Sequence, residues 1–191
     1  MRFAASFLAV LLSGTLGAAS PERFDLIVRG GTVYDGTGAP GRVADLGVRG
    51  DRIAAVGDLS QAQAAKVVDA TGMAVAPGFI NMLSWAVDSL IADGRSMSDL
   101  KQGVTLEIFG EGWSMGPLND AMKKEAEEQQ GDIKYTIDWT TLGGYLDRLV
   151  ARGVSANVAS FVGATTLRIH ELGFVDRPPT PARRQSPRAG W

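Results

Sequence analysis

Few side chains in this sequence could carry out chemistry, and the clearest is a glutamate between two glycines. Glu111 follows the apolar run 104–109 and lies between Gly110 and Gly112. A carboxylate at the carboxyl end of a buried strand can ligate zinc or another divalent metal. The alternative is a loop glutamate that accepts hydrogen bonds from neighbouring backbone N–H groups. The sequence does not separate the two, and Glu111 is the candidate metal ligand.

The other candidates are weaker. The sequence has no cysteine, which excludes disulfides, thiolate nucleophiles and zinc–thiolate sites. Its single histidine, His170, excludes a metal site built from several histidines of this chain, and a structural or surface role is expected for it. Glu107 lies within a predicted strand and is interpreted as a buried ion-pair partner. Ser84 and Ser114 have no neighbouring base, so neither is expected to be a nucleophile.

Two tryptophans flank these candidates. Trp85 and Trp113 follow the first and second predicted buried strands. Packing in a core or an interface is the favoured interpretation, and the wall of a substrate pocket is the alternative.

The length and the charge of the chain limit how many domains can position these side chains and which partners are expected. The chain has 191 residues, of which 45% are hydrophobic, enough for one domain or a domain with a small appendage. The formal net charge is −2, which gives no indication of binding to nucleic acid or to an anionic membrane surface.

Residues 1–20 resemble a secretory signal. Arg2 is followed by the apolar stretch Phe3–Leu12 and a small-residue segment up to Ser20. The alternative is an uncleaved anchor, but the apolar stretch is short for a bilayer span. The prediction is therefore an exported protein, periplasmic or secreted, that begins after residues 18–20 and has no membrane contact after cleavage.

Residues 21–76 predict a small antiparallel β-sandwich unit. Short strand patterns alternate with turn formers, and Gly50-Asp51 is typical of a two-residue hairpin loop. Gly30-Gly31 is interpreted as a turn. Gly36-Thr37-Gly38 is not a phosphate loop, because no helix is predicted after it.

Pro77-Gly78 marks the change to a different pattern over residues 77–177. The run Phe79–Leu83 is suited to a strand buried on both faces. Helical segments over 87–92, 96–102, 119–130 and 140–153 then alternate with strands over 104–109 and 155–162. This order predicts the first strands and helices of a parallel (β/α)8 barrel, with too few strands to close it. The segment 178–191 is basic and proline-rich, which predicts a disordered tail.

Several segments together resemble one enzyme superfamily over residues 24–180. The similar segments are 26–40, 44–57, 68–72, 75–80, 102–105 and 157–163. They resemble the amidohydrolase superfamily, and most closely its D-aminoacylases, the N-acyl-D-amino-acid deacylases. The resemblance covers the N-terminal part of such an enzyme.

The resemblance implies a fold, a reaction and a cofactor. The fold is a (β/α)8 barrel with a small β-sandwich, and the reaction is hydrolysis of the linear amide of an N-acyl amino acid. A zinc ion or another divalent metal would activate water, and a barrel aspartate would transfer the proton. Glu111 lies near the place where D-aminoacylases supply a cysteine ligand.

The chain departs from the superfamily in two ways. The usual Asp-X-His-X-His motif of the first barrel strand is replaced by Asn81-Met82-Leu83-Ser84-Trp85. A deacylase-like subgroup resembles this chain in lacking these histidines and in carrying Gly-Glu-Gly after the second strand. Second, the remaining histidines and the catalytic aspartate are expected beyond residue 191, which points to a truncated or frameshifted gene.

Three functional classes follow. The chain is the N-terminal part of an exported amidohydrolase, a degenerate relative that binds a ligand without chemistry, or a gene fragment without independent function. In each case the chain alone is expected to be inactive, since one histidine and one well-placed carboxylate are too few for a zinc site.

Overall fold

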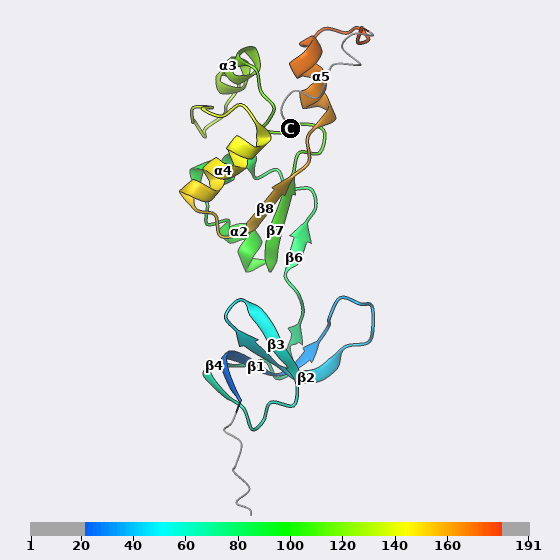
Figure 1. The fold of residues 1–191 in the computed structure, drawn as a ribbon, viewed down its shortest axis with the longest axis vertical. Coiled ribbons are helices and arrows are strands. Elements are labelled where there is room, and N and C mark those ends of the chain that lie inside the picture. Colours follow the sequence, from blue (N-terminus) through cyan, green and yellow to red (C-terminus); the bar gives the residue numbers. More distant parts are fainter. Residues whose placement is uncertain (1–21, 181–191) are drawn as a thin grey trace, which may run out of the picture. The chain divides into compact units, whose positions relative to one another are not determined.

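The computed structural model describes residues 22–180, which divide at Pro77-Gly78 into two compact units (Figure 1). We call residues 22–77 the β unit and residues 78–180 the α/β unit. The predicted signal over 1–20 lies outside the described residues, as does the part of the predicted tail beyond Thr180. No helix of residues 22–180 is both long enough and apolar enough to cross a membrane.

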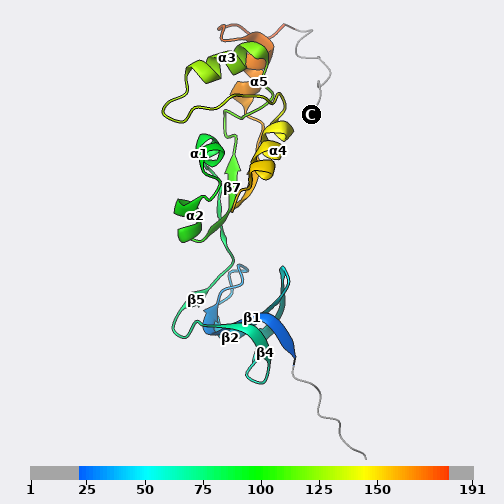
Figure 2. The same cartoon turned by 90° about the vertical axis from the view of Figure 1, so that its left-hand side faces the viewer.

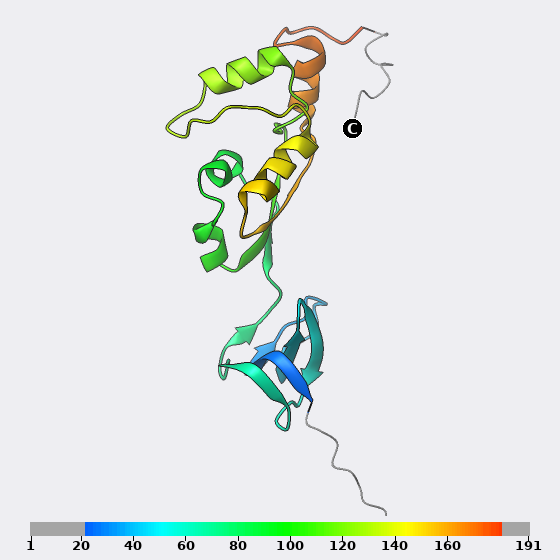
Figure 3. The ribbon, with the colours of Figure 1, turned by 60° about the vertical axis from the view of Figure 1, so that its left-hand side comes forward.

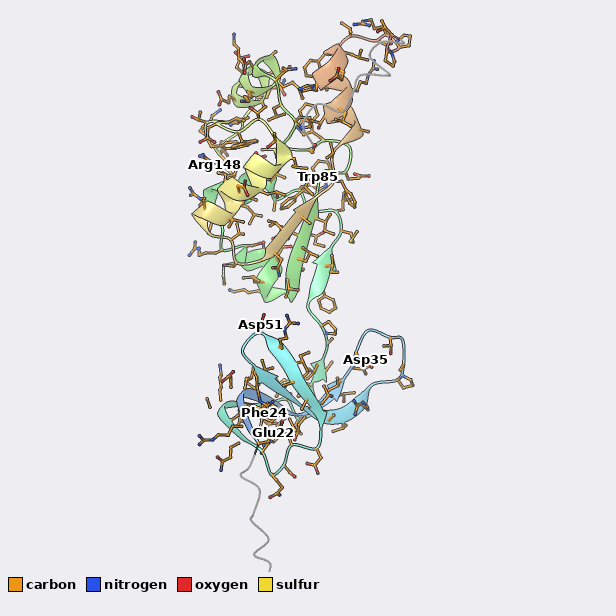
Figure 4. The ribbon with its side chains drawn as sticks, in the orientation of Figure 1. Glu22, Phe24, Asp35, Asp51, Trp85 and Arg148 are labelled. Atoms are coloured by element: carbon orange, nitrogen blue, oxygen red, sulfur yellow. The ribbon has the colours of Figure 1, made fainter. Side chains whose placement is uncertain are left out.

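The β unit is a single five-stranded sheet. Its strands are β1 (Arg23–Val33), β2 (Arg42–Arg49), β3 (Arg52–Gly57), β4 (Gln63–Asp69) and β5 (Ala74–Val75). The order is β3-β2-β1-β4, with β5 also paired to β1. Phe24, Ile27 and Leu59 form its small core, and the guanidinium of Arg49 lies 4.6 Å from the centroid of the Phe24 ring (Figure 4).

The prediction of a wholly antiparallel sandwich is wrong for the described residues of this unit. The hairpins β1–β2 and β2–β3 are antiparallel, but β1 pairs with β4 and with β5 in parallel. The cause is the connection after β3, which carries the chain to the other side of the central strand β1. Alternation of apolar residues does not reveal the direction of such a strand.

Gly30-Gly31 is not a turn, as the sequence had indicated, but an irregularity within β1. The register with β2 shifts between Val28 and Gly31. Gly30 has a φ of 70°, and its N–H donates to Oδ1 of Asp45 at 2.8 Å. A glycine with positive φ is typical of a β-bulge, so β1 bends here and continues.

The α/β unit contains a three-stranded parallel sheet. Its strands, in spatial order, are β6 (Phe79–Asn81), β7 (Val104–Phe109) and β8 (Asn157–Ser160). The helices are α1 (Val87–Ala92), α2 (Met97–Lys101), α3 (Asp120–Glu128), α4 (Leu142–Arg152) and α5 (Ala164–Leu172) (Figures 1 and 2). The predicted alternation of parallel strands and helices is confirmed, whereas the complete barrel stays a prediction.

Local sequence signals explain where the two longer central helices begin. The side chain of Asn119 accepts a hydrogen bond from the N–H of Met122 at the start of α3. The hydroxyl of Thr141 accepts one from the N–H of Gly144 at the start of α4. Both residues belong to the types that cap helix N-termini. The sequence indicates Asn119 as a cap and leaves Thr140 and Thr141 as alternatives for the next helix, of which the structure has Thr141. Helix α5 was not predicted, and no side chain caps it.

One core joins the helices to one face of the sheet. Tyr145 and Leu149 on α4 are fully buried, with Leu90 on α1 and Phe109 on β7 almost so. The hydroxyl of Tyr145 donates to the carbonyl of Val87 at 2.9 Å, which ties α4 to α1. Figure 3 shows the ribbon of these helices beside the sheet. The α/β unit therefore buries a real hydrophobic core on this face.

The prediction that 79–83 is buried on both faces is wrong within the described residues. Phe79 is 61% exposed, Ile80 54%, Met82 57% and Leu83 50%. None of these four side chains joins the core of the α/β unit, whose strand residues come from β7 and β8. In addition, β6 pairs only with β7 among the described strands. The apolar run therefore forms an exposed surface.

Candidate functional site

The carboxyl ends of β6 and β7 carry most of the predicted site residues. The loop after β7 contains Glu111 and Trp113, and the loop after β6 contains Ser84 and Trp85. In parallel α/β folds this edge of the sheet is where ligands usually bind. The structure therefore brings these four residues to one end of the three-stranded sheet, where Figure 4 labels Trp85.

The loop that presents Glu111 is fixed by two glycines and by backbone hydrogen bonds. Gly110 has a φ of 86° and Gly112 a φ of 80°, which L side chains rarely adopt. A Cβ at Gly110 would lie 2.1 Å from the carbonyl oxygen of Phe161. The carbonyl of Gly112 accepts a hydrogen bond from the N–H of Thr165 at 2.9 Å. The two glycines thus fix the backbone that presents Glu111.

The Glu111 side chain is exposed and makes no hydrogen bond or ion pair with another residue of the described range. The alternative of a loop glutamate that accepts backbone hydrogen bonds therefore has no support among residues 22–180. Within the same range, no group of three or more His, Cys, Asp or Glu residues could hold a metal ion. Glu111 is free to bind a ligand, but these residues do not by themselves form a metal centre.

Glu107 differs from the sequence interpretation, because it is buried without a basic partner. Its side chain is fully buried, and it forms no salt bridge with any described lysine, arginine or histidine. Instead the hydroxyl of Ser84 donates to its Oε2 at 2.7 Å, and the hydroxyl of Ser96 donates to its Oε1 at 2.5 Å. A buried polar group needs such partners, which sequence spacing alone did not indicate.

These hydrogen bonds fix the loop after β6. The N–H of Ser84 also donates to the carbonyl of Ile108 at 2.9 Å, so the loop is held to β7 by backbone and side chain. Ser84 thus holds this loop to β7, and its hydroxyl has a carboxylate neighbour, Glu107, that the sequence did not indicate. The residues on either side of it, Leu83 and Trp85, are 50% and 69% exposed.

Trp85 and Trp113 line a groove of about 620 Å³ in the α/β unit. Its floor is apolar and includes the buried Met115 and Met122. A small cavity of about 40 Å³ shares Trp85 and Trp113 with the groove and also borders Glu111. Both tryptophans are exposed, so they do not pack in a core, whereas the interface and the substrate-pocket wall stay predictions.

The charged side chains that line the groove are acidic. They are Asp88, Glu125 and Asp132, and no lysine or arginine is found among the described lining residues. The hydroxyl of Tyr135 donates to Asp88. Burial and this hydrogen bond raise the pKa of Tyr135, so its hydroxyl stays a neutral donor across the physiological range.

Two further candidates have structural roles. The Ser114 hydroxyl donates to the carbonyl of Gly116 at 2.6 Å and accepts from the N–H of Gly163 at 3.0 Å. His170 lies on α5, half-buried, and its Nδ1 is 3.1 Å from the carboxylate of the adjacent Glu171. His170 belongs to no group of three or more potential metal ligands among the described residues.

The relatives found by sequence and the solved structures found by shape agree with one another. No family model matches the chain. The chain is 38% identical over 169 residues to a D-aminoacylase of Alcaligenes xylosoxydans xylosoxydans. The aligned region covers 86% of this chain and 34% of the relative. A solved D-aminoacylase with a binuclear metal centre superimposes with a TM-score of 0.74 at 39% identity, over 85% of this chain and 34% of that one.

A second solved structure is similar to the chain over the same share of its length. It is an N-acyl-D-glutamate deacylase from Bordetella bronchiseptica, in complex with zinc and a phosphonate inhibitor. The TM-score is 0.72 at 35% identity, over 86% of this chain and 34% of that one. The chain therefore spans about a third of the length of the relatives it matches.

These likenesses make the chain homologous to enzymes of the amidohydrolase superfamily. Within that superfamily its homologues are the D-aminoacylases and the N-acyl-D-amino-acid deacylases, as the sequence motifs had indicated.

Proposed function

We propose that this chain supplies the N-terminal third of a metal-dependent hydrolase that cleaves the linear amide bond of N-acyl-D-amino acids. The observation that carries the proposal is 38% identity to a D-aminoacylase over 86% of the chain, together with the TM-score of 0.74 to a solved one. The small-molecule substrate class follows from those relatives.

The described residues contribute to a substrate site more than to a metal site. Trp85, Trp113 and Glu111 surround the small cavity at the carboxyl ends of the strands. We propose that Glu111 supplies one carboxylate ligand to a zinc ion or another divalent metal in the full-length parent. Residues 22–180 hold no group of three ligands, so the other ligands must come from other residues, and the chain alone should not hydrolyse amides.

The test of the activity compares two proteins with zinc supplied. One is the 191-residue chain, and the other is the full-length parent, reconstructed from the coding sequence that follows in either reading frame. Amine release from a panel of N-acyl-D-amino acids and their L-enantiomers is measured. We expect turnover by the parent only, with the D-enantiomers preferred. A parent that hydrolyses none of the panel contradicts the proposal, and turnover by the chain alone contradicts the assignment of the missing ligands.

The role of Glu111 is tested by Glu111→Gln in the parent, which keeps the shape and removes the charge. Zinc content and turnover should both fall. Glu128→Gln, an exposed glutamate on α3, is the matched control. If the Glu111 variant keeps both metal and turnover, Glu111 is not a ligand.

A relative that binds without chemistry is the second candidate function. It is considered because Leu83 and Trp85, both exposed, stand where the superfamily motif has histidines, although a deacylase-like subgroup also lacks these histidines. A parent that binds an N-acyl-D-amino acid in calorimetry but releases no amine would identify this class.

We also propose export, on the basis of residues 1–20. Mass spectrometry of the protein from the periplasm or the medium should show a chain that begins after residues 18–20. An intact Met1 would contradict cleavage.

A further inference from the structure

The groove beside the strand ends combines aromatic rings with charge of one sign. Trp85 is 69% exposed, Trp113 38% and Phe174 62%, so their rings are accessible from the solvent. These residues come from three separate segments, yet they line one groove of about 620 Å³. This volume is within the range of small-molecule sites.

The acidic side chains of the groove come from three places in the sequence. Asp88 lies on α1, Glu125 on α3 and Asp132 in the loop after α3. The Tyr135 hydroxyl donates a hydrogen bond to the Asp88 carboxylate, and the side-chain amide of Gln129 donates one to Glu125 at 3.0 Å. Neither partner is cationic, so the negative charge of these groups is not neutralised by them.

We infer that this groove binds a small organic cation with an apolar body, of the alkylammonium type. Accessible tryptophan faces attract a cationic head through their quadrupole, and the carboxylates add attraction of the same sign. The apolar floor at Met115 and Met122 would receive the aliphatic part. The same carboxylates, none of which borders the small cavity proposed for the substrate, repel an anionic ligand within the groove. This inference goes beyond the proposed function and does not depend on it, since binding needs no metal and no turnover.

The experiment uses the 191-residue chain and three octyl probes below their micelle-forming concentrations. The probes are octyltrimethylammonium, octyl sulfonate and a neutral octyl glucoside, and binding is followed by tryptophan fluorescence and by calorimetry. We expect the cationic probe to bind at least about tenfold more tightly than the anionic one, with the neutral probe between them. Equal affinity for all three, tighter binding of the anionic probe or no binding would overturn the inference.

Two pairs of variants locate the bound probe. Glu125→Gln should weaken binding of the cation about threefold, whereas Glu128→Gln on the same helix should not, because Glu128 does not line the groove. Trp85→Ala should weaken it by a larger factor, whereas Phe161→Ala should not, although Phe161 is also an exposed aromatic residue. Equal effects within either pair would place the probe elsewhere and overturn the inference.

The segment 181–191 contains three cations, Arg183, Arg184 and Arg188, so its competition with the probe has to be tested. A full chain with these three residues changed to glutamine tests this competition. We expect the affinity for octyltrimethylammonium to stay within twofold of the unmodified chain. If the probe binds only to the triple variant, the groove is a site for this segment and the inference is wrong.

Discussion

The two glutamates at the end of β7 are four residues apart in sequence and have opposite surroundings. Glu107 faces the helices, is fully buried and receives hydrogen bonds from two serines. Glu111 lies beyond the strand end, is exposed and has no partner among the described residues. The Glu107 carboxylate therefore holds two loops together, whereas the Glu111 carboxylate is available for a ligand.

The largest expected effect is the difference in stability between Glu107→Ala and Glu111→Ala. Glu107→Ala removes two hydrogen bonds to a carboxylate and leaves a cavity, which should lower the free energy of unfolding by about 2–3 kcal/mol. Glu111→Ala should change it by less than about 0.5 kcal/mol. Urea unfolding followed by tryptophan fluorescence measures this, because every tryptophan of the chain lies beyond residue 77. Equal losses of unfolding free energy in the two variants would contradict the different roles given to the two carboxylates.

Ser84→Ala should have an intermediate effect. It leaves Oε2 of Glu107 without its donor, at a cost of about 1–2 kcal/mol in the free energy of unfolding. In the background of Glu107→Ala the same change should cost much less, since the partner is already gone. If Ser84→Ala costs the same in both backgrounds, the hydrogen bond does not account for the burial of Glu107.

Thr141→Ala tests the helix that covers the buried face of the sheet. Loss of the cap on α4 should lower the free energy of unfolding by about 1 kcal/mol. Thr141→Ser keeps the hydroxyl and is the control, for which a smaller loss is expected. A loss larger than that of Glu107→Ala would mean that helix α4, and not the buried carboxylate, dominates the stability of this face.

The smallest effect concerns a carboxylate at the surface. Hydrogen bonds from the side chain and backbone of Arg95 lower the pKa of Asp93 from 3.8 to about 2. Because the folded pKa is below the unfolded one, the contribution to stability is present above pH 3.8 and is lost as the pH falls to about 2. Carbon-detected NMR should give a midpoint near 2, and Arg95→Gln should return it toward 3.8. An unchanged midpoint in that variant would exclude Arg95 as the cause.

Local signals in the sequence were sufficient for several elements. The apolar run 104–109 lies between Gly103 and Gly110 and coincides with β7. Asn119 and Thr141 cap α3 and α4 because cap preference depends on the neighbouring backbone alone. Strand β7 and the two caps therefore followed from residue types at short spacing.

Features that depend on distant residues could not be predicted in this way. The partners of Glu107 come from two loops, and nothing in the spacing of Ser84 and Ser96 points to a carboxylate on β7. The groove is lined by residues from Trp85 to Phe174, which only the folded chain brings together. Helix α5 was missed because it follows Gly163 without a side-chain cap.

The parallel pairing of β1 with β4 has a consequence for the order of folding. Strands β1, β2 and β3 follow one another through short connections, so their contacts are local. The contact between β1 and β4 joins Arg23 to Gln63 and needs a much longer loop to close. We therefore expect β4 to dock last as the β unit forms. The amide hydrogens of β4 that bond to β1 should accordingly exchange with solvent before those between β1 and β2.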